Sequence, residues 1–111
     1  MNPNISVLIS TNRPYQIFAK RVVDKLFEQD MTNNEIIICH TPDIVIEDDR
    51  VILVEDKLCV NGAQGYNQAA RASKGDYLVV LCDDHDPMTN LNDVLFLFDT
   101  DEFKDKEYKV G

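Results

Sequence analysis

The stretch LVVLCDDHDP, residues 78–87, decides the fold expected for this chain. Its apolar half is short and lacks a polar face, which is typical of a strand buried in a parallel sheet. Asp83, Asp84 and Asp86 then follow within four positions. Crowded carboxylates repel one another, and a divalent cation relieves the repulsion. Hard oxygen ligands favour Mg²⁺ or Mn²⁺, with His85 as an additional ligand. The alternative is a solvated acidic turn that caps the next helix.

Apolar segments with strand character alternate with segments of helical periodicity along the rest of the chain. The expected strands are residues 5–9, 35–39, 51–54 and 76–82. Three helices are expected. The first has Pro14 in its first turn and stops near residues 29–34, and the second covers residues 62–73 and is stopped by Gly75. The third follows Pro87, is capped by Thr89 or Asn90, and carries Leu91, Val94, Leu95 and Phe98. This order predicts a mostly parallel sheet covered by helices on both faces.

Length and composition favour a single domain over residues 1–111. The formal charge of -9, from 20 acidic and 11 basic residues, argues against a grip on the phosphate backbone of nucleic acid. No apolar run approaches the ~20 residues that a membrane span needs, and no basic leader opens the chain, so we expect a cytoplasmic protein. The spacing of Cys39, Cys59 and Cys82 indicates neither a disulfide framework nor a zinc site. Cys39 and Cys82 are expected to be buried at strand ends.

Polar segments follow three of the expected strands. They are residues 10–13, 40–43 and 83–86. In parallel α/β sheets the carboxyl ends of the strands meet at one edge, where ligands bind. The sequence therefore predicts that a cation and an anion are held together at this edge. A plain turn, in which Asn12 tolerates an unusual backbone angle, is the alternative for residues 10–13.

Three consecutive motifs carry a resemblance to a known family. They are NGAQGYNQAA (61–70), ASKGDYLVVL (72–81) and CDD (82–84). The first has a glycine-containing loop and an Asn-x-Ala helix, the second has a Gly-acidic-aromatic strand start, and the third is an aspartate motif. In this order they resemble the signature of the family-two glycosyltransferases of GT-A fold. Residues 5–14 are similar to the first strand and nucleotide loop of that family, and residues 35–39 to its second strand. The resemblance implies a Rossmann-like three-layer α/β/α domain, of which this chain is similar to the N-terminal, nucleotide-binding half.

The resemblance further implies a site for a nucleotide-diphosphosugar donor, with a uridine diphosphate sugar as the first expectation. The residues that it assigns to nucleotide binding are Ser10, Thr11, Asn12, Arg13, Asp43, Asn61, Gly62, Gln64, Asn67 and Asp83. It assigns a divalent metal, Mn²⁺ or Mg²⁺, to Asp84 and Asp86, and this ion would neutralise charge on the departing nucleoside diphosphate. The alternatives are a helix cap and first turn for Asn61, Gly62 and Gln64, and a tie between helix and loop for Asn67.

The chain departs from the family pattern at several positions. Residues 40–43, His-Thr-Pro-Asp, stand where the family has an acidic pair that reads the base, so that only Asp43 could substitute. Tyr66 stands where many members have an arginine, and Cys82 where the first aspartate of the motif is usual. The identity of the nucleotide therefore stays open.

Two functions of different classes remain open from the sequence. The first is a glycosyltransferase that passes the sugar to an acceptor that the sequence does not identify, with its general base expected beyond residue 111. The second is a catalytically silent binding or interaction module in which the aspartates cap the helix after Pro87; a receiver-like phospho-acceptor is a distant third. The charged residues near the C-terminus are expected to be solvated: Asp99, Asp101 and Glu102. An uncovered sheet edge would favour self-association.

Overall fold

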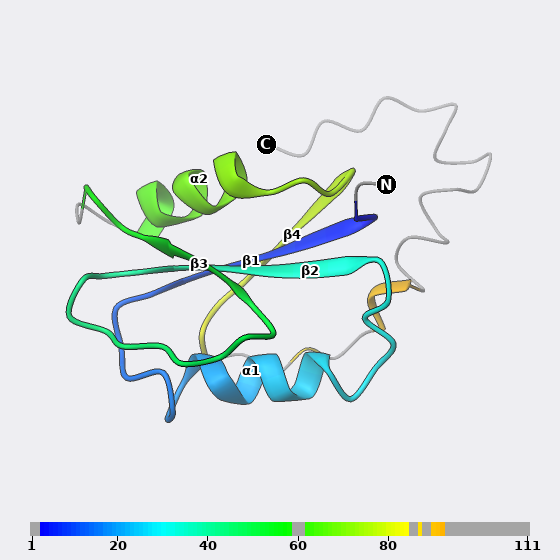
Figure 1. The fold of residues 1–111 in the computed structure, drawn as a ribbon, viewed down its shortest axis with the longest axis horizontal. Coiled ribbons are helices and arrows are strands. Elements are labelled where there is room, and N and C mark those ends of the chain that lie inside the picture. The colour runs from blue at the N-terminus through cyan, green and yellow to red at the C-terminus, as the bar shows by residue number, and fades with distance from the viewer. Residues whose placement is uncertain (1–2, 59–61, 85–86, 88–89, 93–111) are drawn as a thin grey trace.

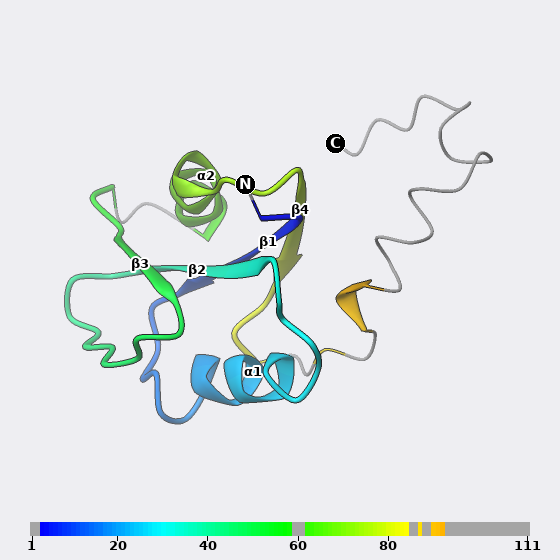
Figure 2. The same ribbon diagram turned by 45° about the vertical axis from the view of Figure 1, so that its right-hand side comes forward.

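A four-stranded parallel sheet with a helix on each face forms the structure, a computed structural model that describes residues 3–58, 62–84, 87 and 90–92. The elements in chain order are β1 (Ile5–Thr11), α1 (Ala19–Leu26), β2 (Asn34–His40), β3 (Ile52–Glu55), α2 (Gly62–Ala72) and β4 (Tyr77–Leu81). The strand order is β3-β2-β1-β4, and each neighbouring pair is parallel. Figures 1 and 2 show α1 and α2 on opposite sides of the sheet. The predicted α/β class with a parallel sheet is confirmed, and the arrangement is compatible with a Rossmann-like fold.

The two central strands are apolar on both faces because each face packs against a helix layer. In β1, Val7 and Ile9 face the core around α1, whereas Leu8 faces α2. In β2, Ile36 and Ile38 belong to the α1 side and Ile37 and Cys39 to the α2 side. All these side chains are at most 2% exposed. Of the expected strand over residues 35–39, which has no polar face in sequence, residues 36–39 are buried as predicted, including Cys39, whereas Glu35 is half-buried.

The chain reverses its direction of travel across the sheet after β3. It first moves outward from β1 to β2 and β3, and α2 then carries it back to β4 on the other side of β1. Such a reversal is a topological switch point, and it lies between β1 and β4. Their ladder runs in register from Ile5 opposite Tyr77 to Ile9 opposite Leu81. The carboxyl ends of the two strands therefore lie side by side.

Helix α1 begins later than the sequence predicts. Pro14 starts a separate turn, in which its carbonyl accepts hydrogen bonds from the backbone N–H groups of Ile17 and Phe18 at 3.3 and 3.2 Å. The helix follows from Ala19, and Ile17 stays outside the core with 60% of its surface exposed. The face of α1 that packs on the sheet is Ala19, Val22, Val23 and Leu26.

Gly75, which the sequence predicts as the stop of the second helix, is required by close packing at the start of β4. Helix α2 ends at Ala72, and Gly75 does not have a positive φ. A Cβ at this position would lie 2.6 Å from the backbone nitrogen of Ser6. The Gly75 N–H instead donates to Ser6 Oγ at 2.8 Å, and the Ser6 hydroxyl donates to Glu35 Oε2 at 2.6 Å. This contact joins the start of β4 to the amino ends of β1 and β2.

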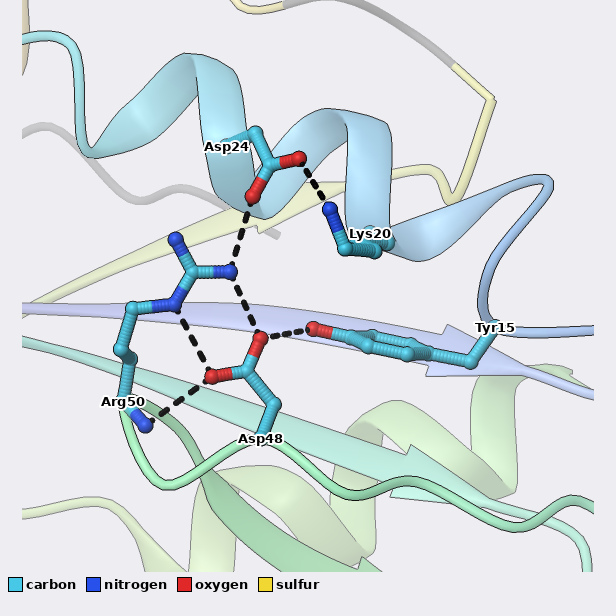
Figure 3. A network of polar contacts seen from close by, with 5 residues as sticks. All are labelled: Tyr15, Lys20, Asp24, Asp48 and Arg50. Atoms are coloured by element: carbon cyan, nitrogen blue, oxygen red, sulfur yellow. Dashed lines mark hydrogen bonds and ion pairs between the residues drawn. The ribbon is translucent and has the colours of Figure 1, made fainter.

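The connection between β2 and β3, residues 41–51, crosses the α1 face of the sheet without regular structure. Ile44 and Ile46 pack into the core around α1, whereas Val45 is 77% exposed. Figure 3 shows the polar network that anchors this connection to α1 and the turn before it. Its contacts are Tyr15 Oη to Asp48 Oδ2 at 2.6 Å, Arg50 to Asp48 at 2.7 Å, Arg50 to Asp24 at 2.8 Å, and Lys20 to Asp24 at 2.7 Å.

The described residues after β4 return to the α1 side of the sheet. Leu91 is 4% exposed within the α1-side core, and its N–H donates to Gln29 Oε1 at 2.7 Å. Asn90 Oδ1 accepts the N–H of Asn92 at 3.0 Å, which is the geometry of a helix cap and agrees with the expectation for Asn90. The rest of the predicted third helix, with Val94, Leu95 and Phe98, lies outside the described residues.

Both edges of the described sheet expose apolar side chains. On β4, Leu78 and Val80 are 49% and 57% exposed; on β3, Ile52 and Leu53 are 42% and 40% exposed. Self-association through an edge stays a prediction. Among the described residues, no helix has the length and apolar character needed to cross a membrane.

Replacing Asp48 tests the network of Figure 3. Hydrogen bonds from Arg50 hold the pKa of the Asp48 carboxyl well below its usual range. Its charged form therefore stabilises the fold above about pH 4, and this contribution is lost as the pH falls further. We expect Asp48→Asn to lower the free energy of unfolding at neutral pH by about 1–3 kcal/mol, with a smaller difference near about pH 3. Urea unfolding at both pH values measures this, with the exposed neighbour Asp49→Asn as control. An equal loss at both pH values would contradict the electrostatic account.

Candidate functional site

A polar cluster occupies the switch point between β1 and β4. Thr11 ends β1 and Arg13 follows in the adjoining loop, while Asp83 and Asp84 lie in the turn after β4. These residues are joined by hydrogen bonds and ion pairs. The predicted convergence of the segments after the first and fourth strands is therefore present. Ligands of open α/β sheets bind in this position.

Asp83 is the centre of the cluster and is 7% exposed. Its Oδ2 accepts the Thr11 hydroxyl at 2.7 Å and Arg13 Nε at 3.1 Å, and its Oδ1 pairs with the terminal nitrogen Nη2 of the same guanidinium. The ladder between β1 and β4 ends with Ile9 opposite Leu81, so the same register places Thr11 opposite Asp83. The side chains thus continue the pairing of the two strands beyond the last backbone pair.

The Arg13 guanidinium also reaches the second carboxylate. Its terminal nitrogen lies 3.3 Å from Asp84 Oδ2, and its carbon lies 4.0 Å from the centre of the Phe18 ring. The Arg13 and Asp84 side chains are 38% and 46% exposed, so both can be reached from solvent. The cluster therefore presents one cationic and one anionic group at the surface above a buried carboxylate.

The ionisation states follow from these contacts. Burial alone would raise the pKa of the Asp83 carboxyl, but hydrogen bonds from Arg13 and Thr11 outweigh burial and hold this pKa below its usual range. The hydrogen bond to Asp83 in turn raises the pKa of Arg13. Asp83 is therefore a carboxylate and Arg13 a cation at neutral pH.

Helix α2, on the face of the sheet opposite α1, packs close to the ends of β1 and β4 beside the cluster. Gly65 is buried against Ser10, and a Cβ on Gly65 would overlap the Ser10 hydroxyl and lie 3.0 Å from Ser10 Cβ. The Tyr66 hydroxyl donates to the Leu81 carbonyl at 2.7 Å, which ties α2 to the end of β4. Burial, followed by the nearby Cys82, raises the pKa of Tyr66 to about 12, so its hydroxyl stays a donor. Tyr66, which stands where the resembled family has an arginine, has a structural contact here.

A second polar group joins the segment after β3 to α2. Asp56, 6% exposed, follows β3, and its Oδ1 accepts the Gln68 amide at 2.7 Å. Gln68 also accepts the Lys57 N–H at 3.1 Å, so it makes the tie between helix and loop that was considered for its neighbour Asn67. The signal for Asp56 was present, since an acidic residue follows a predicted strand there as Asp83 does after β4. The Thr41 hydroxyl is buried and has no hydrogen-bond partner among the described residues.

The other predicted nucleotide ligands are placed as follows. Asn12 and Asn67 are exposed, Gln64 is half-buried in α2, and Gly62 begins that helix. Asp43 is exposed in the turn after β2, and no hydrogen bond within the described residues joins it to the Arg13 cluster. The left-handed residue of the described chain is Asn33, with φ 64°, so Asn12 does not have an unusual backbone angle. Asn61, His85 and Asp86 lie outside the described residues.

Cys82 is exposed, and the prediction that it is buried was wrong. It follows Leu78 and Val80 on the alternation of β4, and this face of the strand is not covered by α2. Cys39, on the corresponding face of β2, is covered by α2 and is buried. The two cysteines differ because one strand lies at the centre of the sheet and the other at its edge.

The described residues offer few ligands for the predicted metal ion. Within the ranges that the structure describes, no group of three or more His, Cys, Asp or Glu side chains could hold a metal. Asp84 supplies exposed hard oxygen atoms, whereas both oxygens of the buried Asp83 are bonded to Thr11 and Arg13. Mg²⁺-like ions are commonly held by one or two carboxylates together with substrate phosphates and water. An ion at this position would therefore need ligands from a phosphate and from water in addition to the protein.

The sequence matches no family model and no curated protein. Conclusions on function therefore depend on the geometry of the switch point and on the order of the motifs. Membership of a glycosyltransferase family stays a prediction.

Substitution of Gly65 tests how closely α2 must approach β1. Alanine in place of glycine inside a helix ordinarily stabilises by about 1 kcal/mol. Here we expect Gly65→Ala to destabilise by about 1–3 kcal/mol, because its Cβ overlaps the Ser10 hydroxyl. Adding Ser10→Ala removes that hydroxyl and should recover part of the loss, as measured by urea unfolding of the four proteins. Stabilisation by Gly65→Ala in both backgrounds would contradict the close approach.

Proposed function

We propose that this chain binds a nucleotide-diphosphosugar together with a divalent ion at the β1/β4 switch point, as the donor-binding part of a glycosyltransferase. The observation that carries the proposal is the cluster of Arg13, Asp83 and Asp84, in which an exposed guanidinium that could bind phosphate lies beside an exposed carboxylate, Asp84, that could bind a metal. Its position at the switch point is where ligands of such sheets bind. The order of the motifs in residues 61–84 supports the same reading.

Each exposed group of the cluster has a suitable role. Asp84 would hold Mn²⁺ or Mg²⁺, with Asp86 as a further ligand, and the ion would offset charge on the diphosphate leaving group. Arg13 presents a planar fork of N–H donors, which matches phosphate oxygens in pairs. Asn12 is exposed in the same loop and would contact the ribose or the base. The donor of first choice is a uridine diphosphate sugar.

Transfer of the sugar also requires an acceptor hydroxyl and a base that takes its proton. Asp84 and Arg13 act on the diphosphate side of the bond that breaks, so the described cluster has no part in this step. We assign this base to none of the described residues. The proposal for the present chain is therefore donor binding and stabilisation of the leaving group, with acceptor binding assigned elsewhere.

A second function, a silent interaction module, has one observation in its favour. Both oxygens of Asp83 are occupied by Thr11 and Arg13 without any ligand. The cluster could therefore serve only to join β1 to β4. The two functions differ in one respect: donor binding requires Asp84 to hold a metal and the exposed side of Arg13 to bind phosphate, whereas the interaction module requires neither.

Calorimetric titration with uridine diphosphate, with and without Mn²⁺, separates the two functions. We expect binding in the presence of Mn²⁺ that weakens about tenfold or more without the metal or in Asp84→Ala. Asp76→Ala is the matched control, because this exposed carboxylate lies next to the amino end of β4, whereas the cluster lies at the carboxyl end of the same strand. It should bind as the unmodified chain does. Absence of binding with and without Mn²⁺ would contradict the nucleotide site.

A further inference from the structure

We propose that Arg13 makes the binding of metal and diphosphate at the β1/β4 site interdependent: it acts as counterion of Asp83 and Asp84 until a diphosphate takes over part of its guanidinium. The inference rests on the proposed function, because it concerns how the same site takes its two ligands. It assigns to Arg13 a role in the order and coupling of binding, beyond contact with the nucleotide.

The guanidinium is shared between two carboxylates that differ in burial. Its Nε lies 3.1 Å from Asp83 Oδ2, and one terminal nitrogen pairs with both Asp83 Oδ1 and Asp84 Oδ2, the latter at 3.3 Å. Asp83 is almost fully buried, whereas the Asp84 side chain is 46% exposed. The longer contact to Asp84 is therefore the one that a ligand can exchange, while the bidentate pair with Asp83 stays.

The position of Arg13 is fixed from two sides. Asp83 holds the guanidinium by its edge, and the Phe18 ring lies 4.0 Å from its carbon. Arginine stacks on aromatic faces in this way, which restricts the plane of its N–H donors. With 38% of the Arg13 side chain exposed, an anion can reach this held cation without rearrangement of the buried pair.

A divalent ion on Asp84 would lie close to the Arg13 cation. Like charges at such a distance disfavour each other, so the guanidinium opposes metal binding in the absence of an anion. A diphosphate reverses the sign of this effect, because its oxygens can bind the metal and accept N–H bonds from Arg13 at once. The diphosphate thus strengthens metal binding. By linkage, the metal must strengthen diphosphate binding by the same factor.

Titration of Mn²⁺ followed by its electron paramagnetic resonance, with and without uridine diphosphate, measures the coupling without any assay of activity. In the unmodified chain we expect the nucleotide to tighten Mn²⁺ binding about tenfold or more. In Arg13→Gln, Mn²⁺ alone should bind at least about threefold tighter, and the nucleotide should tighten it less. Lys25→Gln removes an equal charge from the last turn of α1, outside the cluster, and should leave both values unchanged.

Arg13→Lys keeps the positive charge but removes the planar arrangement of N–H donors, so it separates the two effects. It also replaces Arg13→Gln in the experiment if that variant does not fold. It should still oppose Mn²⁺ alone but bind the nucleotide more weakly, because the two-pronged donor is lost. The inference is overturned if the unmodified chain binds nucleotide and Mn²⁺ together while both Arg13 variants retain its affinities and its coupling. Absence of nucleotide binding by the unmodified chain would instead overturn the proposed function itself.

Discussion

One buried carboxylate, Asp83, joins the two strands between which the topology of this sheet reverses. The backbone ladder of β1 and β4 ends at Ile9 and Leu81, and the bond from Thr11 to Asp83 extends the pairing by one further side-chain contact. A buried carboxylate must be paired and hydrogen-bonded to remain charged. Asp83 meets that requirement only because Thr11 and Arg13 come from the end of β1 and the loop after it. The position of that loop, and hence of the candidate site, depends on this constraint.

The contacts of Asp83 stabilise the fold and, under the proposed function, would also position the groups that bind the ligand. Asp83 is committed to the protein, which limits its availability to a ribose, and contact with the ribose stays a prediction. Its commitment leaves Asp84 and the outer side of Arg13 as the groups that can exchange partners. Gly65 contributes by allowing α2 to pack directly on Ser10, next to the end of the same strand. The site is therefore built from a fixed buried pair and an exposed pair that can respond to a ligand.

Much of the fold could be predicted from the sequence because it follows from local patterns. The apolar run over residues 36–39 indicated a strand buried on both faces, and the acidic cluster after residue 81 indicated the site edge. Features that depend on tertiary contacts could not be read in this way. Gly75 resembles a helix cap in sequence, but its glycine is required by the backbone of Ser6. Cys82 resembles Cys39 as a residue at a strand end, but it lies on an edge strand whose outer face α2 does not cover.

The hydrogen-bond partners of the site residues were the feature of the structure that the sequence predicted least well. The sequence placed Arg13 and Asp83 at one edge of the sheet, yet only the register of β1 and β4 sets Thr11 opposite Asp83. Similarly, Gln68 and not Asn67 joins α2 to the loop after β3, because the helix turns that side chain towards Asp56. Such pairings depend on the direction in which each side chain leaves its helix or strand. Sequence periodicity predicts this direction only to within a residue or two.

The most direct test of this account is a double-mutant cycle between Thr11 and Asp83. Thr11→Val removes the hydroxyl with little change of shape, and Asp83→Ala removes its acceptor. Urea unfolding of the unmodified chain, both single variants and the double variant gives the coupling free energy. The account predicts a favourable coupling of at least about 1 kcal/mol, as expected for a buried hydrogen bond to a charged group. Additive losses, with no coupling between the two positions, would contradict the claim that this bond joins β1 to β4.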